Sequence, residues 1–459
     1  MQPAGSAYYI FVVAVFLLYW TAAGHRLVRV GVVLLANYFF CARFGLFYVW
    51  LIPACSSVDY LVGLGLMRFE DRRLRRLLVS LSIALNLFLL IGSRHMGWLL
   101  NRPPGPPSWD WVFPLGLSFY VFQALTYTID LYRRDGEGTH SLLAHLSAAS
   151  FFPTLQAGPI TRISELVKQF GTRPVLDRVA GGQAFFLIGL GLLKKFLIAD
   201  FLADNFVNRV FDTPKLYSGA EALLAIYAYS VQLYCDFSGY TDIARGTALL
   251  LGIRLPINFD HPYLAANPQE FWRRWHITFS NWLRDYLYFS LPGKRGKVMP
   301  YVNLIVTMVL GGLWHGITGT FAVWGLLHGV ALAASRSWQV WRRGRSEISW
   351  SRPLRILATY QFVCLTWVFF RASSLANAAD LLGRIGSLSF SLENVTIPVA
   401  AVLLAAIAVH VVPKNVYARA MNGFATSPSW VHAGALAGVA ILIELFAGHN
   451  SAPFVYSRF

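Results

Sequence analysis

Long apolar runs constrain this chain more than any other feature of its sequence. Clear examples cover residues 7–23, 77–92, 113–129, 399–412 and 432–447. A helix rises about 1.5 Å per residue, so about 18 or more apolar residues can cross a bilayer core of about 30 Å. Hydrophobic residues make up 56% of the chain and charged residues only 13%, against about 25% charged in a soluble domain. We therefore predict an all-α, polytopic membrane protein with about 10–13 transmembrane helices, accompanied by interfacial and re-entrant helices.

The formal net charge of +17 is carried largely by arginines in short segments between apolar runs. Arginines on such loops mark the cytoplasmic side of a membrane protein and contact anionic lipids. The two clusters are Arg68, Arg72, Arg73, Arg75 and Arg76, and Arg336, Arg342, Arg343, Arg345, Arg352 and Arg355. This placement disfavours nucleic acid as a partner. The first apolar run, 7–23, is followed and not preceded by a basic residue, Arg26, which predicts a retained first helix with the N-terminus outside.

The chain shows no internal repeat, and we expect one integral-membrane domain over residues 1–459. Within it we distinguish N-terminal helices at 1–135, a core at 140–335 and C-terminal helices at 354–459. The four cysteines are isolated in apolar runs and form no disulfide or metal pattern. No spacing of histidine, aspartate and cysteine predicts a metal site.

Two apolar stretches carry interruptions typical of a membrane protein with an internal pathway. The segment 151–160 holds two prolines and a glycine, and non-helical backbone at membrane depth occurs only inside protein or along a cavity. Lys194 and Lys195 interrupt the run 189–200. We expect the second stretch to lie at the interface or to pack inside the bundle.

The segment 270–286 is both basic and aromatic. Its large aromatic residues recur every three or four positions, at Trp272, Trp275, Phe279, Trp282 and Tyr286. This spacing predicts one helix with all five on one face, lying at the membrane–water interface beside Arg273, Arg274 and Arg284. These arginines suit an anionic donor. From spacing alone, His276 in this segment either binds a substrate or bonds the backbone.

A second histidine, His315, follows Trp314 in the glycine-rich segment 311–316, between two apolar runs. A polar residue at membrane depth is costly and indicates function, and a neutral imidazole can serve as a base. His328 lies within an apolar helix, where we expect it to form hydrogen bonds inside the bundle.

The segment 232–246 places several polar residues in an apolar setting. They are Asp236, Ser238, Tyr240 and Asp242. The two aspartates are six residues apart and do not share a helical face, which disfavours paired-carboxylate catalysis. Hydrogen bonds to helix ends, or ion pairs with Arg245 and Arg254, are the alternative.

In these segments the chain resembles the membrane-bound O-acyltransferase superfamily, in particular its bacterial alginate O-acetylation branch. The most specific matches are residues 271–278 (FWRRWHIT) and 312–316 (GLWHG). Further matches cover 152–160, 191–200, 236–242, 254–259 and the C-terminal 453–459. The order and spacing of these segments carry the resemblance, since no single one is decisive.

The resemblance implies a helical bundle around a funnel or tunnel in the bacterial inner membrane. His315 matches the presumed catalytic histidine and His276 the second family histidine. The candidate supporting or donor-binding residues are Asp236, Ser238, Tyr240, Asp242, Arg273, Arg274, Trp275 and Trp314. Members of this branch pass acyl groups, typically acetyl, across the membrane for modification of an exported polysaccharide. They work with a periplasmic or membrane-anchored partner of the SGNH-hydrolase-like type.

The expected chemistry takes an acyl group from a cytoplasmic thioester, either acetyl-CoA or an acyl carrier protein, with no bound cofactor. His315 is assigned as the base that deprotonates the acceptor hydroxyl, with a covalent acyl-histidine as the alternative. His276 either polarises the carbonyl or binds the donor. The competing function is a transporter or flippase for a lipid-linked sugar or acyl carrier, which would use the same broken segments as a permeation path.

Overall fold

The computed structural model describes residues 5–43, 45–99, 116–293, 296, 298–342 and 351–446. Every regular element among these residues is a helix, which confirms the predicted all-α class. The C-terminal match at 453–459 and the arginines at 343 and 345 lie outside the described residues.

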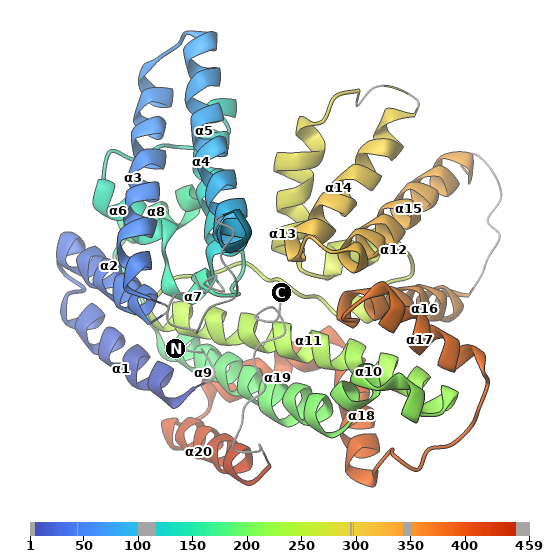
Figure 1. The fold of residues 1–459 in the computed structure, drawn as a ribbon. Coiled ribbons are helices and arrows are strands. Elements are labelled where there is room, and N and C mark those ends of the chain that lie inside the picture. Colours follow the sequence, from blue (N-terminus) through green and yellow to red (C-terminus); the bar gives the residue numbers. More distant parts are fainter. Residues whose placement is uncertain are drawn as a thin grey trace. The chain divides into compact units, whose positions relative to one another are not determined.

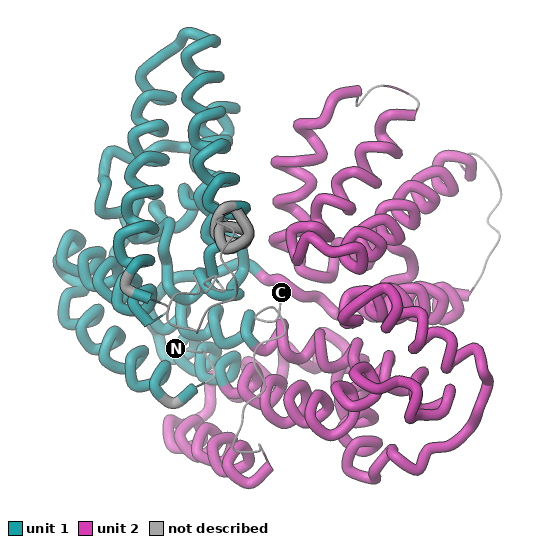
Figure 2. Tube along the Cα trace, in the orientation of Figure 1, with its two compact units in different colours: residues 1–188, 240–256 teal, residues 189–239, 257–459 magenta. Residues whose placement is uncertain are grey.

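The chain divides into two compact units (Figure 2). The first comprises Met1–Ile188 and Tyr240–Pro256, and the second comprises Gly189–Gly239 and Ile257–Phe459. The long helix α11 (Gly219–Leu250) belongs to both, because the boundary falls at Gly239. The single domain over 1–459 stays a prediction.

The first unit is a group of helices with buried polar groups within an apolar core. Its helices are α1 (Ser6–Thr21), α2 (Arg26–Ala42), α3 (Leu46–Arg68), α4 (Arg72–Leu99), α5 (Leu117–Arg133), α6 (Leu142–Ala149), α7 (Phe152–Leu155), α8 (Ile163–Gly171) and most of α9 (Arg178–Leu192). The buried Asp59 of α3 accepts hydrogen bonds from Ser82 Oγ at 2.6 Å and Asn86 Nδ2 at 3.0 Å, both on α4. The short α7 is followed by irregular backbone from 156 to 162, which confirms the break predicted at 151–160.

The second unit begins with π-helical turns and ends with the C-terminal helices. Before α11 come η1 (Leu193–Asp200), η2 (Ala203–Val207), α10 (Asn208–Asp212) and η3 (Pro214–Leu216). After it come η4 (Pro262–Leu264), α12 (Pro268–Arg274), α13 (Ile277–Trp282), η5 (Leu283–Leu287), η6 (Tyr288–Ser290), α14 (Met299–His315), α15 (Gly319–Arg342), α16 (Arg352–Arg371), α17 (Leu375–Gly386), α18 (Ile397–His410), α19 (Lys414–Thr426) and α20 (Ser429–Phe446).

Four described helices are long and apolar enough to cross a membrane: Phe47–Arg68, Arg72–Ile91, Arg352–Arg371 and Ser429–Phe446. A fifth span is possible if α18 and α19, which meet at a 95° bend, form one broken crossing. These helices agree with a multi-pass membrane protein. The predicted number of 10–13 spans and the central tunnel stay predictions.

Helices α14 and α15 form a tight hairpin in the second unit (Figure 1). A Cβ added at Gly312 would lie 2.4 Å from the carbonyl oxygen of Phe321, and one at Gly325 would lie 2.4 Å from that of Met308. Small residues let helix backbones approach closely, as is common in membrane bundles. Glycine at these positions therefore sets where the end of α14, with His315, lies against α15.

The segment 270–286 is not the single helix that its aromatic spacing predicts. Helix α12 ends at Arg274, Trp275 is extended, and His276 has a left-handed backbone with φ of +42°. A left-handed non-glycine residue costs about 1–2 kcal/mol, and neighbouring hydrogen bonds offset it. The Ile277 N–H donates to the Asn258 backbone carbonyl at 2.9 Å, and the Thr278 N–H donates to Asn258 Oδ1 at 3.1 Å. The loop before α12 thus competes for the donors that a continuous helix would use.

Candidate functional site

His315 is the last residue of α14, and its side chain is only 3% exposed. Aromatic rings surround it: the ring centroids of Trp314 and Phe370 lie 4.6 and 4.9 Å from that of His315, and Trp324 lies at 5.5 Å. The helix ends there because Gly316 adopts an extended backbone, with φ of 172°. His315 therefore lies at the point where the chain leaves one hairpin helix for the other.

A pocket of about 420 Å³ opens beside His315 within the second unit. Its lining comprises Tyr229, Gln232, His315, Gly316, Thr318, Thr320, Phe321, Phe370, Arg371, Ala372 and Ser373. Thr318 and Ser373 are exposed, whereas Tyr229, Gln232 and His315 are buried. The pocket thus leads from the α14–α15 turn and the end of α16 to the side of α11.

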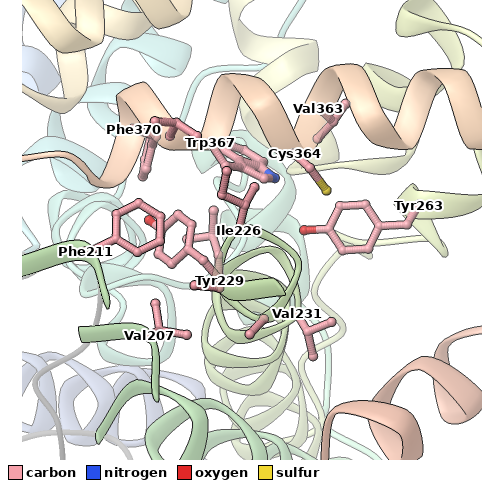
Figure 3. Packing of buried hydrophobic residues seen from close by; sticks show 14 of the residues in the cluster. Val207, Phe211, Ile226, Tyr229, Val231, Tyr263, Val363, Cys364, Trp367 and Phe370 are labelled. Carbon is pink, nitrogen blue, oxygen red and sulfur yellow. The ribbon is translucent and has the colours of Figure 1, made fainter. Parts of the chain in front are cut away.

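Helix α11 supplies the floor of this pocket through Tyr229 and Gln232, three residues apart and so on one helical face. Tyr229 packs against Phe211, with ring centroids 5.4 Å apart, in the core formed with Trp367 and Phe370 of α16 (Figure 3). Gln232 is 3% exposed, and its Oε1 is buried with no hydrogen-bond partner. The amide oxygen thus lies beneath the pocket lining without a hydrogen-bond partner.

Arg371 lines the same pocket at the end of α16. Its guanidinium donates to Asn208 Oδ1 at 3.0 Å and to Asp212 at 3.3 Å. Its Nε is buried and has no hydrogen-bond partner. A donor on Arg371 and an acceptor on Gln232 are thus both unused among pocket-lining residues.

His276 is buried and held in one tautomer by Asn258. Asn258 Oδ1 accepts from the Thr278 backbone N–H, which fixes that atom as the amide oxygen, and it lies 3.1 Å from His276 Nδ1. The proton must therefore be on Nδ1, leaving the lone pair on Nε2. His276 lies between two short helices, outside the helices long enough to span, and burial lowers the pKa of its ring to about 3. The ring is neutral at physiological pH.

Phe279 of α13 connects the two histidines. Its ring stacks on His276 with centroids 4.9 Å apart, and its centroid lies 6.1 Å from that of His315. Trp314 stacks on the same phenyl ring at 4.7 Å. The sequence matches that contain His276 and His315 therefore meet around one aromatic side chain.

Asp236 has a different setting from the histidines. Lys195 Nζ lies 2.8 Å from both Asp236 and Asp200, and the Lys195 side chain is 1% exposed. This confirms that the stretch with Lys194 and Lys195 packs inside the bundle. Ser238 is buried on α11. Tyr240 and Asp242 belong to the first unit, where Asp242 lies 3.7 Å from Arg245.

The arginines of segment 270–286 are not equivalent. Arg274 donates to Glu270 at 2.7 Å and to the Asp260 carbonyl at 3.2 Å, and Arg284 pairs with Asp285 at 2.8 Å. Arg273 is exposed, which leaves it better placed for an anionic ligand. Trp275 is buried against Trp367, with centroids 5.0 Å apart, and supports the core.

His328 has a structural role. Its Nδ1 accepts from the Trp272 indole N–H at 3.3 Å, and its Nε2 lies 2.9 Å from Thr366 Oγ1. Both ring nitrogens are used inside the bundle, which confirms the expectation from the sequence. Among the described residues, no group of three or more His, Cys, Asp or Glu side chains is arranged to hold a metal ion.

Sequence reasoning singled out His315 and His276 but missed Gln232, Arg371 and Asn258. Gln232 opens the polar segment 232–246, so a buried amide in an apolar run was the available signal. The sequence does not predict Arg371 as a pocket residue, because it lies about 56 positions from His315, at the far end of another helix. Pocket partners from separate helices leave no local spacing pattern.

Known proteins are similar in sequence to this chain over much of its length. The model of the membrane-bound O-acyltransferase family (MBOAT) matches residues 108–376, which include both histidines. The probable alginate O-acetylase AlgI of Azotobacter vinelandii is 43% identical over 62% of this chain and 55% of its own length. Its Pseudomonas aeruginosa namesake is 37% identical over 79% of this chain and 70% of its own. The peptidoglycan O-acetyltransferase of Helicobacter pylori is 35% identical over 77% of this chain and 73% of its own length. The chain thus spans from about half to about three quarters of these relatives.

Proposed function

The chain belongs to the membrane-bound O-acyltransferase family, and from this premise we propose that it transfers an acyl group from a thioester to a hydroxyl. The observation that carries the proposal is the position of His315, which is buried and lines a pocket that also has exposed residues in its lining. The names of the relatives favour acetyl as the acyl group and an exported polysaccharide as the final acceptor.

In the proposed reaction the His315 ring takes the proton of the acceptor hydroxyl as its oxygen attacks the thioester carbonyl carbon. The new C–O bond forms, and the tetrahedral intermediate then loses the sulfur as the C–S bond breaks. His315 returns its proton to the leaving thiolate, so the products are an ester and a free thiol, and the ring ends neutral. Direct transfer is the simplest reading, and an acyl-histidine remains the alternative.

The surroundings of His315 suit this chemistry. Phe321, Trp324 and Phe370 pack around the ring, and a largely apolar enclosure limits hydrolysis of the thioester. The pocket supplies hydroxyl and amide groups that can orient an acceptor.

His276 has a narrower role in this proposal. With its proton held on Nδ1 by Asn258, Nε2 can accept a hydrogen bond but cannot donate one to a carbonyl oxygen. We therefore assign His276 to binding the donor or the departing thiol, in preference to polarising the carbonyl. Exposed Arg273 is the candidate for the anionic part of the donor.

The donor and the partner follow from the family and are part of the proposal. A cytoplasmic acetyl-CoA or acyl carrier protein supplies the thioester, with no bound cofactor. An SGNH-hydrolase-like partner, periplasmic or membrane-anchored, completes transfer to the polysaccharide. The protein acts in the bacterial inner membrane with its N-terminus on the periplasmic side.

The test is thiol release and label transfer from radiolabelled acetyl-CoA by the purified protein in lipid nanodiscs. The assay is repeated with an acetylated carrier protein if acetyl-CoA is not used. His25→Ala, an exposed histidine of the first unit, serves as the matched control for His315→Ala. Thioester consumption by the control but not by folded His315→Ala supports the proposal. Equal consumption by both overturns the role of His315, and no consumption from either donor overturns the acyltransferase function.

A further inference from the structure

The second unit contains a buried charge cluster that the proposed reaction does not use. Lys195 Nζ lies 2.8 Å from a carboxylate oxygen of Asp200 and 2.8 Å from one of Asp236. Lys195 and Asp236 are each 1% exposed, and Asp200 is 7% exposed. One ammonium and two ionised carboxylates leave one negative charge over, and a buried charge without compensation is strongly destabilising. The cluster therefore needs one further positive charge.

The π-helical backbone of η1 is what brings Asp200 to Lys195. The two residues are five positions apart, and a π-helix bonds residue i to residue i+5. An α-helix of 3.6 residues per turn would instead place residues five apart about 140° from each other around its axis. The π-helix covers Leu193–Asp200 and so contains both members of the pair. Because π-helical turns are rare and occur often at functional sites, we infer that this contact is the reason for the unusual backbone.

Helix α11 brings Asp236 to this pair and also carries part of the pocket lining. A Cβ added at Gly239 would lie 2.7 Å from a backbone carbonyl oxygen of α9 and 3.4 Å from the Lys195 backbone nitrogen. This close approach of the two backbones holds Asp236, about one turn earlier, against Lys195. Tyr229 and Gln232 precede Asp236 by seven and four residues and share a face of α11 with it. Since both line the pocket, a change in the cluster acts on a helix that forms the pocket.

A proton is the positive charge that fits this place. Asp200 Oδ2 is buried without a hydrogen-bond partner, and such an oxygen is less costly to bury protonated than ionised. The Asp200 side chain keeps 9% of its surface exposed, so a proton can exchange with solvent without an open cavity. In η1, outside the helices long enough to span, burial raises the pKa of Asp200 to about 7, opposed by Lys195 and assisted by Asp236.

The elements packed against η1 bring other titratable groups near the cluster: Asp204 of η2, Tyr234 of α11, His410 of α18, and His432 and Glu444 of α20. Asp204 and Glu444 are exposed carboxylates, which add negative charge. His410 Nε2 accepts from the Tyr263 N–H at 3.3 Å. His432 Nε2 lies 2.7 Å from the Phe424 carbonyl oxygen. The ammonium of Lys194, the next lysine in the chain, lies 5.6 Å from the centroid of the Tyr234 ring.

We propose that Lys195, Asp200 and Asp236 form a proton-dependent contact between η1 and α11. With one proton on the two carboxyl groups the cluster is neutral and closed, and loss of that proton loosens η1 from α11. A carboxyl group in an opened cluster has the ordinary pKa of about 3.9. The closed form therefore binds the proton more tightly, and opening becomes easier as the pH rises from about 4 to about 7, with little change above that. This inference goes beyond the proposed function.

The first test looks for the bound proton by infrared difference spectroscopy between about pH 5 and about pH 8, on protein in nanodiscs without donor. A protonated, buried carboxyl group has a C=O stretch separate from that of a carboxylate. The unaltered protein should show this band at the lower pH and lose it at the higher one, and Asp200→Asn should lack it. Asp236→Asn, in which Lys195 balances the remaining carboxylate, replaces Asp200→Asn if that variant does not fold. A band unchanged in the variant overturns the proposal.

The second test follows the loosening of η1 by hydrogen exchange of its backbone amides. At each pH the exchange rate of residues 193–200 is divided by that in Asp200→Asn, which is neutral at this position and cancels the intrinsic pH dependence of exchange. This ratio should rise by about tenfold or more between about pH 5 and about pH 8. Asp204→Asn is the matched control, since it removes an exposed carboxylate of η2 and should keep the rise. A ratio independent of pH overturns the proposal.

Neither measurement needs a donor, so both decide the inference even if no protein consumes thioester and the proposed function fails. The transfer rate of Asp200→Asn, divided by that of the unaltered protein, should rise over the same pH range, because the neutral variant stays closed. A constant ratio of transfer rates overturns the link between the cluster and the pocket.

Discussion

The middle of α15 and the end of α14 each hold a buried histidine, and the two side chains differ in what surrounds their ring nitrogens. His328 has both ring nitrogens within bonding distance of protein groups, Trp272 and Thr366. His315, one helix earlier in the same hairpin, lines a pocket whose mouth is exposed. Burial and aromatic neighbours are common to both. What distinguishes a structural from a chemical histidine here is access to a cavity.

The largest effect is expected from His315→Ala. Removing a general base lowers transfer by about 10²–10⁴-fold, whereas the thermal unfolding temperature should fall less than in His328→Ala, because one side of His315 lines a pocket. Both are measured on protein in nanodiscs. Rescue of transfer by added imidazole would strengthen the assignment, and transfer within twofold of the unaltered rate contradicts it.

His328→Ala should show the reverse pattern. The indole N–H of Trp272 and the hydroxyl of Thr366 lose a buried partner, which together with the lost packing costs roughly 2–4 kcal/mol of unfolding free energy. Transfer per folded molecule should stay near normal. Thermal unfolding followed by tryptophan fluorescence measures the loss of stability, and transfer assays at low temperature measure the activity of the folded protein. A stable but inactive variant would place His328 in the chemistry.

Asn258→Ala tests whether the fixed tautomer of His276 matters. Without the Asn258 oxygen the Nδ1 proton has no fixed partner. By analogy with groups that orient metal-bound imidazoles, we expect a loss of transfer of about tenfold. Thr278→Val is the matched control, since it removes a different hydrogen bond to the same oxygen and should keep most activity. Equal losses of transfer in both variants would show that Asn258 only stabilises the loop and does not orient His276.

The smallest effect concerns Asp260, in the loop that leads into η4. Burial raises its pKa, but hydrogen bonds from Lys414 and His261 and the charges of Lys414 and Arg274 outweigh burial and lower it overall. A lowered folded pKa stabilises the protein above the unfolded pKa of about 3.9, and this stability is lost as the pH falls through the folded value. The difference in unfolding temperature between the unaltered protein and Lys414→Met should therefore be present at pH 6 and shrink toward pH 3. A difference independent of pH would exclude this ion pair as its source.

The sequence predicts the helical class and both histidines because apolar runs and costly polar residues are local signals. It also anticipates the hydrogen bonds of His328, since a lone polar residue in a helix bundle must find a partner. The break at Trp275 and His276 escapes periodicity because the competing hydrogen bonds come from Asn258, seventeen residues before Trp275. Periodicity does not predict Gln232 and Arg371 as pocket residues either, because the pocket is formed by separate helices and only their packing brings the two side chains together.

The most direct test of the central claim is a side-by-side measurement of His315→Ala and His328→Ala, with single-turnover transfer from labelled donor and thermal unfolding recorded on the same nanodisc samples. We predict that His315→Ala loses transfer and unfolds closer to the normal temperature than His328→Ala does, whereas His328→Ala transfers normally while folded. If both variants lose stability and activity together, or if His315→Ala still transfers, the pocket at the end of α14 is not where the chemistry occurs.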